Sequence, residues 1–334
     1  MSRDDLDTLA DFTPPPARKR TPARSRDHDG DPYSSAPVTP GCTIAQLPPR
    51  LLFAAAAVAA RINPVNPPSF AHAAALVPGG VLEPMRLTLL TAKYWGAAPR
   101  RLTVSFLEAT PNDLANRIVS HMNAWNSRCG ISFARTGGTG QVRISFLGNG
   151  YWSYLGTDVL LIPRNQPTMN LQGFSMATPE SEYKRVVRHE TGHTLGFPHE
   201  HMRQELIARI DHAAAYAYFL RTQGWNRAMV DAQVLTPLSA ASIIGTPADQ
   251  DSIMCYQLPG SITVDHQPIR GGTDINVTDF GFAAKVYPKP AHAAAADDSH
   301  DGGPGHAHAA IADWDVADDV DVEDAVARAD AEAD

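Results

Sequence analysis

The stretch HETGHTLGFPH, residues 189–199, decides how this sequence is interpreted. It contains three histidines, His189, His193 and His199, and Glu190 directly follows the first of them. Residues four apart on a helix share one face, so His189 and His193 can present ring nitrogens to a single ion. Gly196 can turn the chain back and bring His199 to that ion, because glycine adopts positive φ angles without steric cost. The stretch therefore predicts a three-histidine metal site.

The residue types in this stretch are those of catalytic zinc chemistry. Zinc binds imidazole nitrogens, takes about four ligands, and keeps one position for water in catalytic sites. It lowers the pKa of that water toward about 7, so that a neighbouring carboxylate can take the proton. Glu190 is placed for that role. The alternative is an ordinary helix with satisfied histidines, but no packing argument requires all of these residues at these offsets. We therefore predict one catalytic zinc ion with Glu190 as general base.

Two motifs carry a resemblance to a known family. HETGHTLGFPHEH resembles the long zinc signature of the metzincin peptidases, and its Gly-Phe pair and Glu200 resemble the astacin branch. Downstream, SIMCY at residues 252–256 resembles the Met-turn of that branch. The resemblance implies that Met254 lies beneath the zinc and that Tyr256 is a further ligand that swings away and stabilises the oxyanion. Without the zinc motif, both residues would be more typical of a core.

The resemblance also implies a substrate-binding strand and a role for Glu200. In the family, an edge strand of the upper sheet binds the substrate as an added antiparallel strand. The corresponding segment here is Tyr151, Trp152, Ser153 and Tyr154. Glu200 in the family contacts the mature N-terminus, and a local salt bridge is the alternative in this chain.

The cysteines depart from the family pattern. The chain has three cysteines, Cys42, Cys129 and Cys255, which are too few for the two disulfides of the family. No clear counterpart of the family's zinc-blocking aspartate is found. Cys42 could instead supply a thiolate to the open metal position and keep the enzyme latent, as in some other metzincins. The alternative is a partly buried free thiol without such a role.

Hydrophobic periodicity predicts an α+β domain over residues 93–288. Strands are expected at 101–109, 131–136, 141–148, 151–156 and 158–163, and helices at 111–130 and 178–196, with a final helix at 278–288. Thr178 and Thr278 are the expected helix caps. The implied architecture is a metzincin-type twisted sheet with mainly antiparallel edges and two long helices, over a mostly helical or irregular C-terminal subdomain. Within that subdomain, His201 and His212 are expected at the surface because neither has ligand spacing.

The ends of the chain differ from this domain. Residues 1–40 have a disordered composition, residues 41–92 form a possible pro-segment or N-terminal brace, and residues 289–334 form an acidic low-complexity tail. Whether residues 1–85 are removed is left open by the sequence. The apolar run that begins at Leu51 is too short to span a bilayer, and we interpret it as a short packed helix rather than a signal sequence.

Charge and composition narrow the function classes. The net charge is −8, but the tail carries −11 and the first forty residues −1, so residues 41–288 carry about +4. This mild charge lacks the clustered basic stripe of nucleic-acid-binding proteins. The predicted function is a monomeric zinc endopeptidase that acts on protein or peptide substrates. The alternatives are a non-cleaving zinc- or peptide-binding module and a zinc hydrolase of a non-peptide substrate. The resemblance suggests secretion, although the N-terminus carries no ordinary signal peptide.

Overall fold

The computed structural model describes residues 42–66, 92–238 and 247–290. All of these residues belong to one compact unit, Gly41–Asp334. The predicted disordered segment 1–40 and the acidic tail beyond residue 290 lie outside the described residues, as does the second half of the predicted brace.

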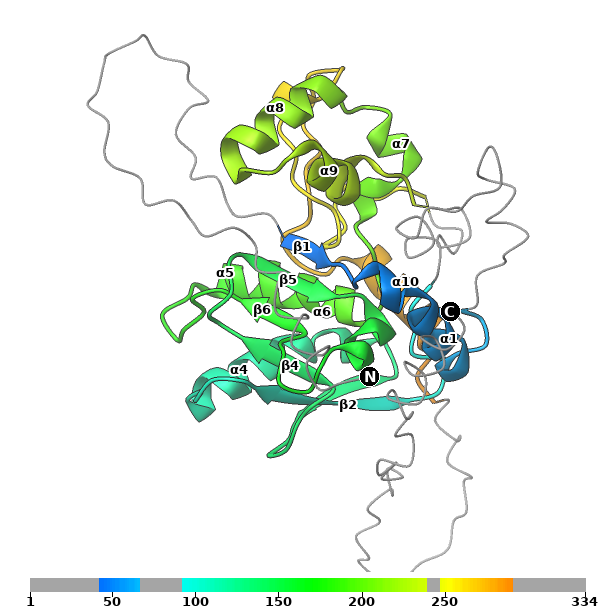
Figure 1. Ribbon diagram of the computed structural model, residues 1–334, viewed down its shortest axis with the longest axis vertical. Helices are drawn as coiled ribbons and strands as arrows, with labels where there is room; N and C mark the ends of the chain where they lie inside the picture. The colour runs from blue at the N-terminus through cyan, green and yellow to red at the C-terminus, as the bar shows by residue number, and fades with distance from the viewer. Residues whose placement is uncertain (1–41, 67–91, 239–246, 291–334) are drawn as a thin grey trace, which may run out of the picture. The chain divides into compact units, whose positions relative to one another are not determined.

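A six-stranded mixed sheet forms the larger layer of the described part (Figure 1). Its strands are β1 (Cys42–Ala45), β2 (Arg100–Phe106), β3 (Ile131–Arg135), β4 (Val142–Ser145), β5 (Tyr151–Tyr154) and β6 (Met169–Leu171). They lie in the order β1-β5-β6-β4-β2-β3. Within this sheet β5 and β6 pair antiparallel, whereas the other four pairs are parallel. The alternation of buried Leu102 and Val104 in β2 shows why the predicted strand forms at this place.

The α+β fold class is confirmed, but three details of the predicted sheet are wrong. Both outermost pairs are parallel, and the antiparallel strand β5 is covered by β1 instead of lying at the edge. Residues 158–163 do not form a strand, because Gly156–Leu161 is a 3-10 helix. The apolar side chains of Val159 and Leu161 are buried in the core from this helix, so the apolar run does not indicate a strand here.

Two helical segments pack with the sheet. Helix α4 (Asn112–Met122) buries Leu114, Ile118 and Met122 on one face. The second segment is continuous from α5 (Glu180–Glu182) through a π-helix (Tyr183–Val187) to α6 (Arg188–Thr194). Pro179 stands at its N-cap position, and the predicted cap Thr178 instead accepts a hydrogen bond from the Ser175 amide.

The chain beyond the site is mostly helical or irregular, as predicted. It contains α7 (Gln204–Ile207), α8 (His212–Gln223), α9 (Arg227–Val230), a π-helix (Asp231–Leu235) and α10 (Val277–Val286), with short 3-10 helices at Glu200–Met202 and Gly260–Ile262. Asn276 caps α10 in a capping box with Asp279, so the predicted cap Thr278 lies inside the helix. His212 is exposed at the start of α8, as expected.

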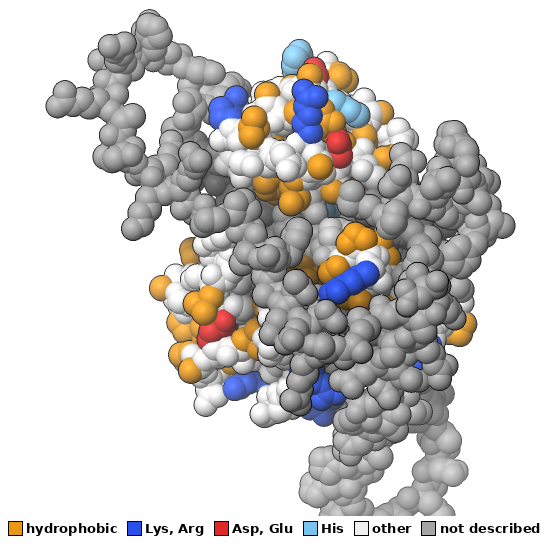
Figure 2. Space-filling model, in the orientation of Figure 1, with side chains coloured by type: hydrophobic (Ala, Val, Ile, Leu, Met, Phe, Trp, Pro, Cys, Tyr) orange, Lys and Arg blue, Asp and Glu red, His pale blue; other side chains and the backbone are white. Residues whose placement is uncertain are grey.

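The N-terminal apolar run forms a packed helix, as predicted. Helix α1 (Leu52–Ile62) follows the 3-10 turn Pro49–Leu51 and packs Leu52, Ala55 and Val58 against Leu161 and Ile162. Among the described residues, no helix combines the length and apolar content needed to cross a membrane. On the face drawn in Figure 2, the described Lys and Arg side chains lie singly among apolar and other residues.

Candidate metal centre and active site

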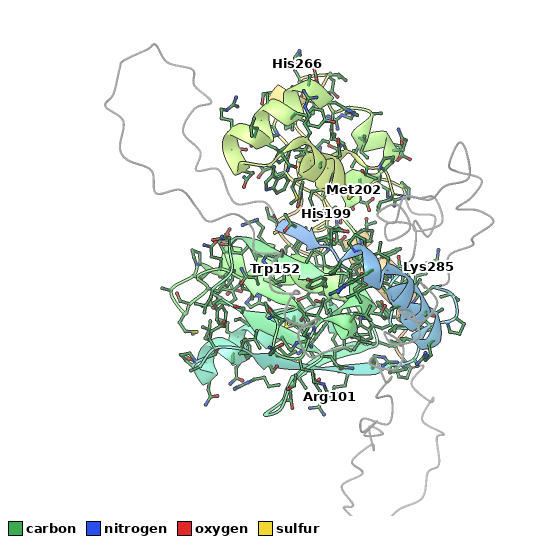
Figure 3. All side chains as sticks on the ribbon, viewed as in Figure 1. Arg101, Trp152, His199, Met202, His266 and Lys285 are labelled. Carbon is green, nitrogen blue, oxygen red and sulfur yellow. The ribbon has the colours of Figure 1, made fainter. Side chains whose placement is uncertain are left out.

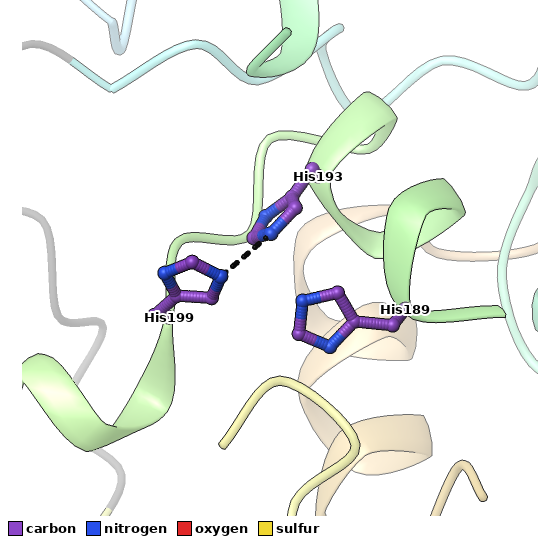
Figure 4. Close-up of side chains that lie close together, drawn as sticks. All are labelled: His189, His193 and His199. Atoms are coloured by element: carbon purple, nitrogen blue, oxygen red, sulfur yellow. Dashed lines mark hydrogen bonds between the residues drawn. The ribbon is translucent and has the colours of Figure 1, made fainter. Parts of the chain in front are cut away.

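Helix α6 and the turn after it bring the three predicted histidines together. His189 and His193 lie on α6, which ends at Thr194, and Gly196 adopts a φ of 91° at the turn. His199 then stands at the start of the next 3-10 helix, Glu200–Met202. Figure 4 shows the three rings facing one another, and Figure 3 places His199 relative to Trp152 of β5. The local sequence thus folds as the histidine spacing predicts.

The distances between the rings fit a single ion. His193 Nε2 and His199 Nε2 are 3.0 Å apart, and one nitrogen from each of the three rings lies within 4.8 Å of the others. Two imidazole nitrogens at this distance cannot both present lone pairs to each other without a proton or a cation between them. A shared cation resolves the conflict, and imidazole nitrogens are ligands that zinc accepts.

The outer nitrogens of two rings are already bound. His189 Nδ1 lies 2.6 Å from the carbonyl of Ile253, and His193 Nδ1 lies 2.8 Å from the carbonyl of Phe197. A carbonyl only accepts, so Nδ1 donates in both cases and Nε2 keeps its lone pair for a metal. His189 Nε2 is buried and has no hydrogen-bond partner among the described residues. The donor set therefore fits zinc.

Burial keeps these histidines neutral. Desolvation lowers the pKa of His189 to about 4 and holds the pKa values of His193 and His199 well below their usual range. All three side chains are therefore uncharged at neutral pH, which is the form that binds metal.

Glu190 is fully buried and has one free oxygen. Its Oε2 accepts a hydrogen bond from Ser153 Oγ at 2.8 Å, whereas its Oε1 has no hydrogen-bond partner in the described part of the chain. Burial raises the pKa of Glu190 to about 8, against the lowering effect of the bonds from Ser153 and Cys42. A cation at the histidines would lower this pKa again. Ser153 thus holds the carboxylate from β5 and leaves Oε1 available for a proton.

Met254 and Tyr256 lie at the same centre. The Tyr256 ring centroid is 4.2 Å from that of His199 and 6.4 Å from that of His189, and its hydroxyl is buried without a partner among the described residues. Burial raises the pKa of Tyr256 well above its usual range, so the phenol keeps its proton. Met254 packs against α6 at Gly192, where a Cβ atom would collide with the methionine sulfur.

His201 is not a surface residue, and that prediction is wrong. Its ring is fully buried and stacks on the Tyr256 ring at a centroid distance of 4.3 Å. His201 Nε2 donates to the main-chain oxygen of Gln233 at 3.0 Å, and Nδ1 accepts from the Tyr256 amide at 3.4 Å. His201 positions Tyr256 but does not have the sequence spacing of a metal ligand, so the spacing of the histidines could not reveal its role.

Glu200 makes the local salt bridge. Its Oε1 accepts from Arg203 Nε at 2.9 Å and from the Asp249 amide at 3.1 Å. The contact with a mature N-terminus that the resemblance implied stays a prediction.

Cys42 reaches the site from β1. Its thiol, His189 and Glu190 each offer a ligand atom, and these three atoms lie within 4.8 Å of one another. The residue is a buried free cysteine, and desolvation together with the charge of Glu190 raises the pKa of its thiol well above the usual range. Cys129 and Cys255 are also free and buried. Of the three cysteines, Cys42 is the one grouped with the metal-site residues.

The fold and the site define a metallopeptidase of the metzincin type, and comparison with known proteins gives its family. The family model described as Astacin, a peptidase family, matches residues 90–267, which is more than half of the chain. This protein belongs to the astacin family.

Individual relatives agree with this assignment. The solved structure of myroilysin is 30% identical, covers 59% of this chain and 96% of its own, and superposes with a TM-score of 0.56. Zinc metalloproteinase nas-27 of Caenorhabditis elegans is 31% identical over 99 residues, which are 30% of this chain and 21% of the relative. The match therefore spans about a fifth of that curated relative.

Proposed function

We propose that this protein is a zinc-dependent endopeptidase that hydrolyses peptide bonds within polypeptides. The observation that carries the proposal is the convergence of three neutral histidines with a carboxylate that keeps one oxygen free. Membership of a peptidase family supports it.

His189, His193 and His199 would hold the zinc ion through Nε2. Bound there, zinc acts as a Lewis acid that polarises the substrate carbonyl and activates water. Glu190 accepts a proton from the attacking water at Oε1 and passes it to the leaving amine, while Ser153 fixes the carboxylate through Oε2. The Tyr256 phenol, which keeps its proton, donates a hydrogen bond to the oxyanion of the hydrolysed carbonyl.

The substrate would bind as an extended strand beside β5. In the structure, β1 lies in that position, with Cys42 opposite Tyr151 and Ala45 opposite Tyr154. The edge of β5 is therefore shaped to accept an added strand. This edge favours a polypeptide over a small non-peptide substrate, and the free Glu190 oxygen argues against a non-cleaving zinc module, which needs no base.

With β1 in place, we propose that the protein is latent. β1 covers the edge of β5, and ligand atoms of Cys42, His189 and Glu190 lie within 4.8 Å of one another. A bound zinc ion would deprotonate the thiol despite its raised pKa. Cys42 would then be the fourth ligand and would exclude water.

The test uses the full chain, loaded with zinc, as Cys42→Ala and as Cys42→Ala/Glu190→Gln. Each is incubated with a complex peptide library, and the cut sites are read by mass spectrometry. We expect internal cuts only when Glu190 is present. If neither protein cuts, both are tested again with Thr43→Pro and Ala45→Pro, so that β1 no longer covers β5. Equal zinc content without cuts in either protein would then favour the binding-module alternative, and cleavage of small esters alone would favour the non-peptide hydrolase.

A further inference from the structure

We propose that Gln233 is a substrate-binding residue that recognises the main chain of the bound polypeptide from the side opposite β5. The inference rests on the proposed function, because it assigns a residue to the same cleft, meaning the space between β5 and Gln233 that β1 occupies in the structure. Gln233 belongs to no recognisable sequence motif, and only the fold shows that it lies beside β1.

The observation is a pair of hydrogen bonds to one residue of β1. The Ile44 amide donates to Gln233 Oε1 at 3.1 Å, and Gln233 Nε2 donates to the Ile44 carbonyl at 3.0 Å. The Gln233 side-chain amide thus makes the two main-chain hydrogen bonds that a second neighbouring strand would make to Ile44. Alternate residues of a strand direct their main-chain groups to opposite neighbours, so Ile44 faces Gln233 while Thr43 and Ala45 face β5.

Gln233 is rigidly held at this place. It lies in the π-helix Asp231–Leu235 and is 3% exposed. Its main-chain oxygen accepts the hydrogen bond from His201, whose ring stacks on Tyr256. Gln233, which binds β1, is thus held in place by His201 next to Tyr256. A buried side chain positioned in this way is expected of a substrate-binding residue.

The chemistry of the amide also suits a substrate that runs in the opposite direction to β1. β1 is parallel to β5, whereas the family resemblance implies a substrate antiparallel to it. Reversing a chain exchanges the order of its N–H and C=O groups along the cleft. A half-turn about the last torsion of Gln233 exchanges the donor and acceptor in the same way, and that torsion is broad and nearly two-fold. Gln233 can therefore bind either chain, whereas Glu or Leu cannot.

The test separates substrate binding from retention of β1. The full chain with Cys42→Ala, Thr43→Pro and Ala45→Pro removes the thiol and two amide donors of β1, so the segment no longer competes for the cleft. In this background, Gln233 is compared with Gln233→Leu and Gln233→Glu, after circular dichroism and zinc content have confirmed folding. Gln204→Leu, at an exposed position in α7, is the matched control.

Two readouts are needed: KM and kcat for a peptide cut in the library screen, and Ki of the peptide TIAQLP, which copies residues 43–48. Loss of two neutral hydrogen bonds should raise both KM and Ki on the order of tenfold and leave kcat nearly unchanged. A raised Ki with an unchanged KM would show that Gln233 only retains β1, and a lower kcat with an unchanged KM would place its effect on Tyr256. Either result, or no change at all, would overturn the proposal.

The proposed function can fail separately. If the parent protein cuts nothing, the affinities of fluorescently labelled TIAQLP and of an uncleaved extended peptide still report on Gln233. Weaker binding of both by the Gln233 variants would support main-chain recognition. Unchanged binding of the second peptide would refute it.

Discussion

At the residue scale, Glu190, the proposed general base, is held by a hydroxyl group from the sheet. Ser153 Oγ lies 2.8 Å from Glu190 Oε2 and 2.9 Å from the Glu190 main-chain oxygen. We expect Ser153→Ala in the Cys42→Ala protein to lower kcat on the order of tenfold while KM and zinc content stay unchanged, because the carboxylate loses the bond that aims it. Steady-state kinetics with one library-derived peptide measure this. A rise in KM alone would show instead that Ser153 acts through the substrate strand.

A buried ion pair makes a second prediction at this scale. Lys93 Nζ lies 3.0 Å from Asp158 Oδ1, and these side chains are 1% and 4% exposed. We expect Lys93→Met to lower the free energy of unfolding by about 3–5 kcal/mol, because Asp158 is left buried without its counter-charge. Lys93→Met/Asp158→Asn should recover much of this loss in urea unfolding.

The control is Arg270–Asp251, an ion pair with two short contacts of 2.6 and 2.7 Å whose side chains are 63% and 57% exposed. Arg270→Met should cost less than about 1 kcal/mol, since exposed pairs contribute little. Similar losses for both pairs would contradict the argument from burial.

At the scale of elements, the packing of α6 on the residues around Met254 requires Gly192. A Cβ at this position would collide with the Met254 sulfur and lie 3.3 Å from Trp125. We expect Gly192→Ala to lower the melting temperature and weaken zinc binding, because α6 must shift and carries His189 and His193 with it. Gly281→Ala in α10 is the control, because no atom lies within 4 Å of its added Cβ. That change should be neutral or slightly stabilising.

The same scale shows which elements the sequence could predict. α1, α6 and β5 depend on local periodicity and turn residues, and each lies near its predicted place. β6 could not be predicted, because a strand of three residues carries too little alternation. β1 has four residues, as β5 does, but it lies next to a proline-containing turn outside the segment whose periodicity indicated the domain. The pairing of β1 with β5 is also long-range, so local spacing holds no information about it. The grouping of the three candidate zinc ligands could be predicted for the opposite reason, since they lie within one helix and the turn after it.

At the scale of the whole molecule, the proposed latency would bring distant parts of the chain together at one ion. Cys42 comes from the N-terminal strand and the histidines come from α6 and the turn that follows it. Cobalt(II) can replace zinc at such sites as a spectroscopic probe, and a thiolate ligand adds an intense charge-transfer band in the near ultraviolet. We expect this band in the cobalt-loaded full chain and its loss in Cys42→Ala, with the metal still bound by the histidines.

Cys129→Ala is the matched control for this experiment. Cys129 is also a buried free thiol, but it packs beside Ile131 in the main core and not at the metal site. The band should therefore persist in Cys129→Ala. Because the readout is a ligand-to-metal transition, it is independent of catalysis and separates coordination from simple blocking of β5. If the full chain binds cobalt without the band, Cys42 does not coordinate the metal, and any latency must come from β1 covering the strand edge.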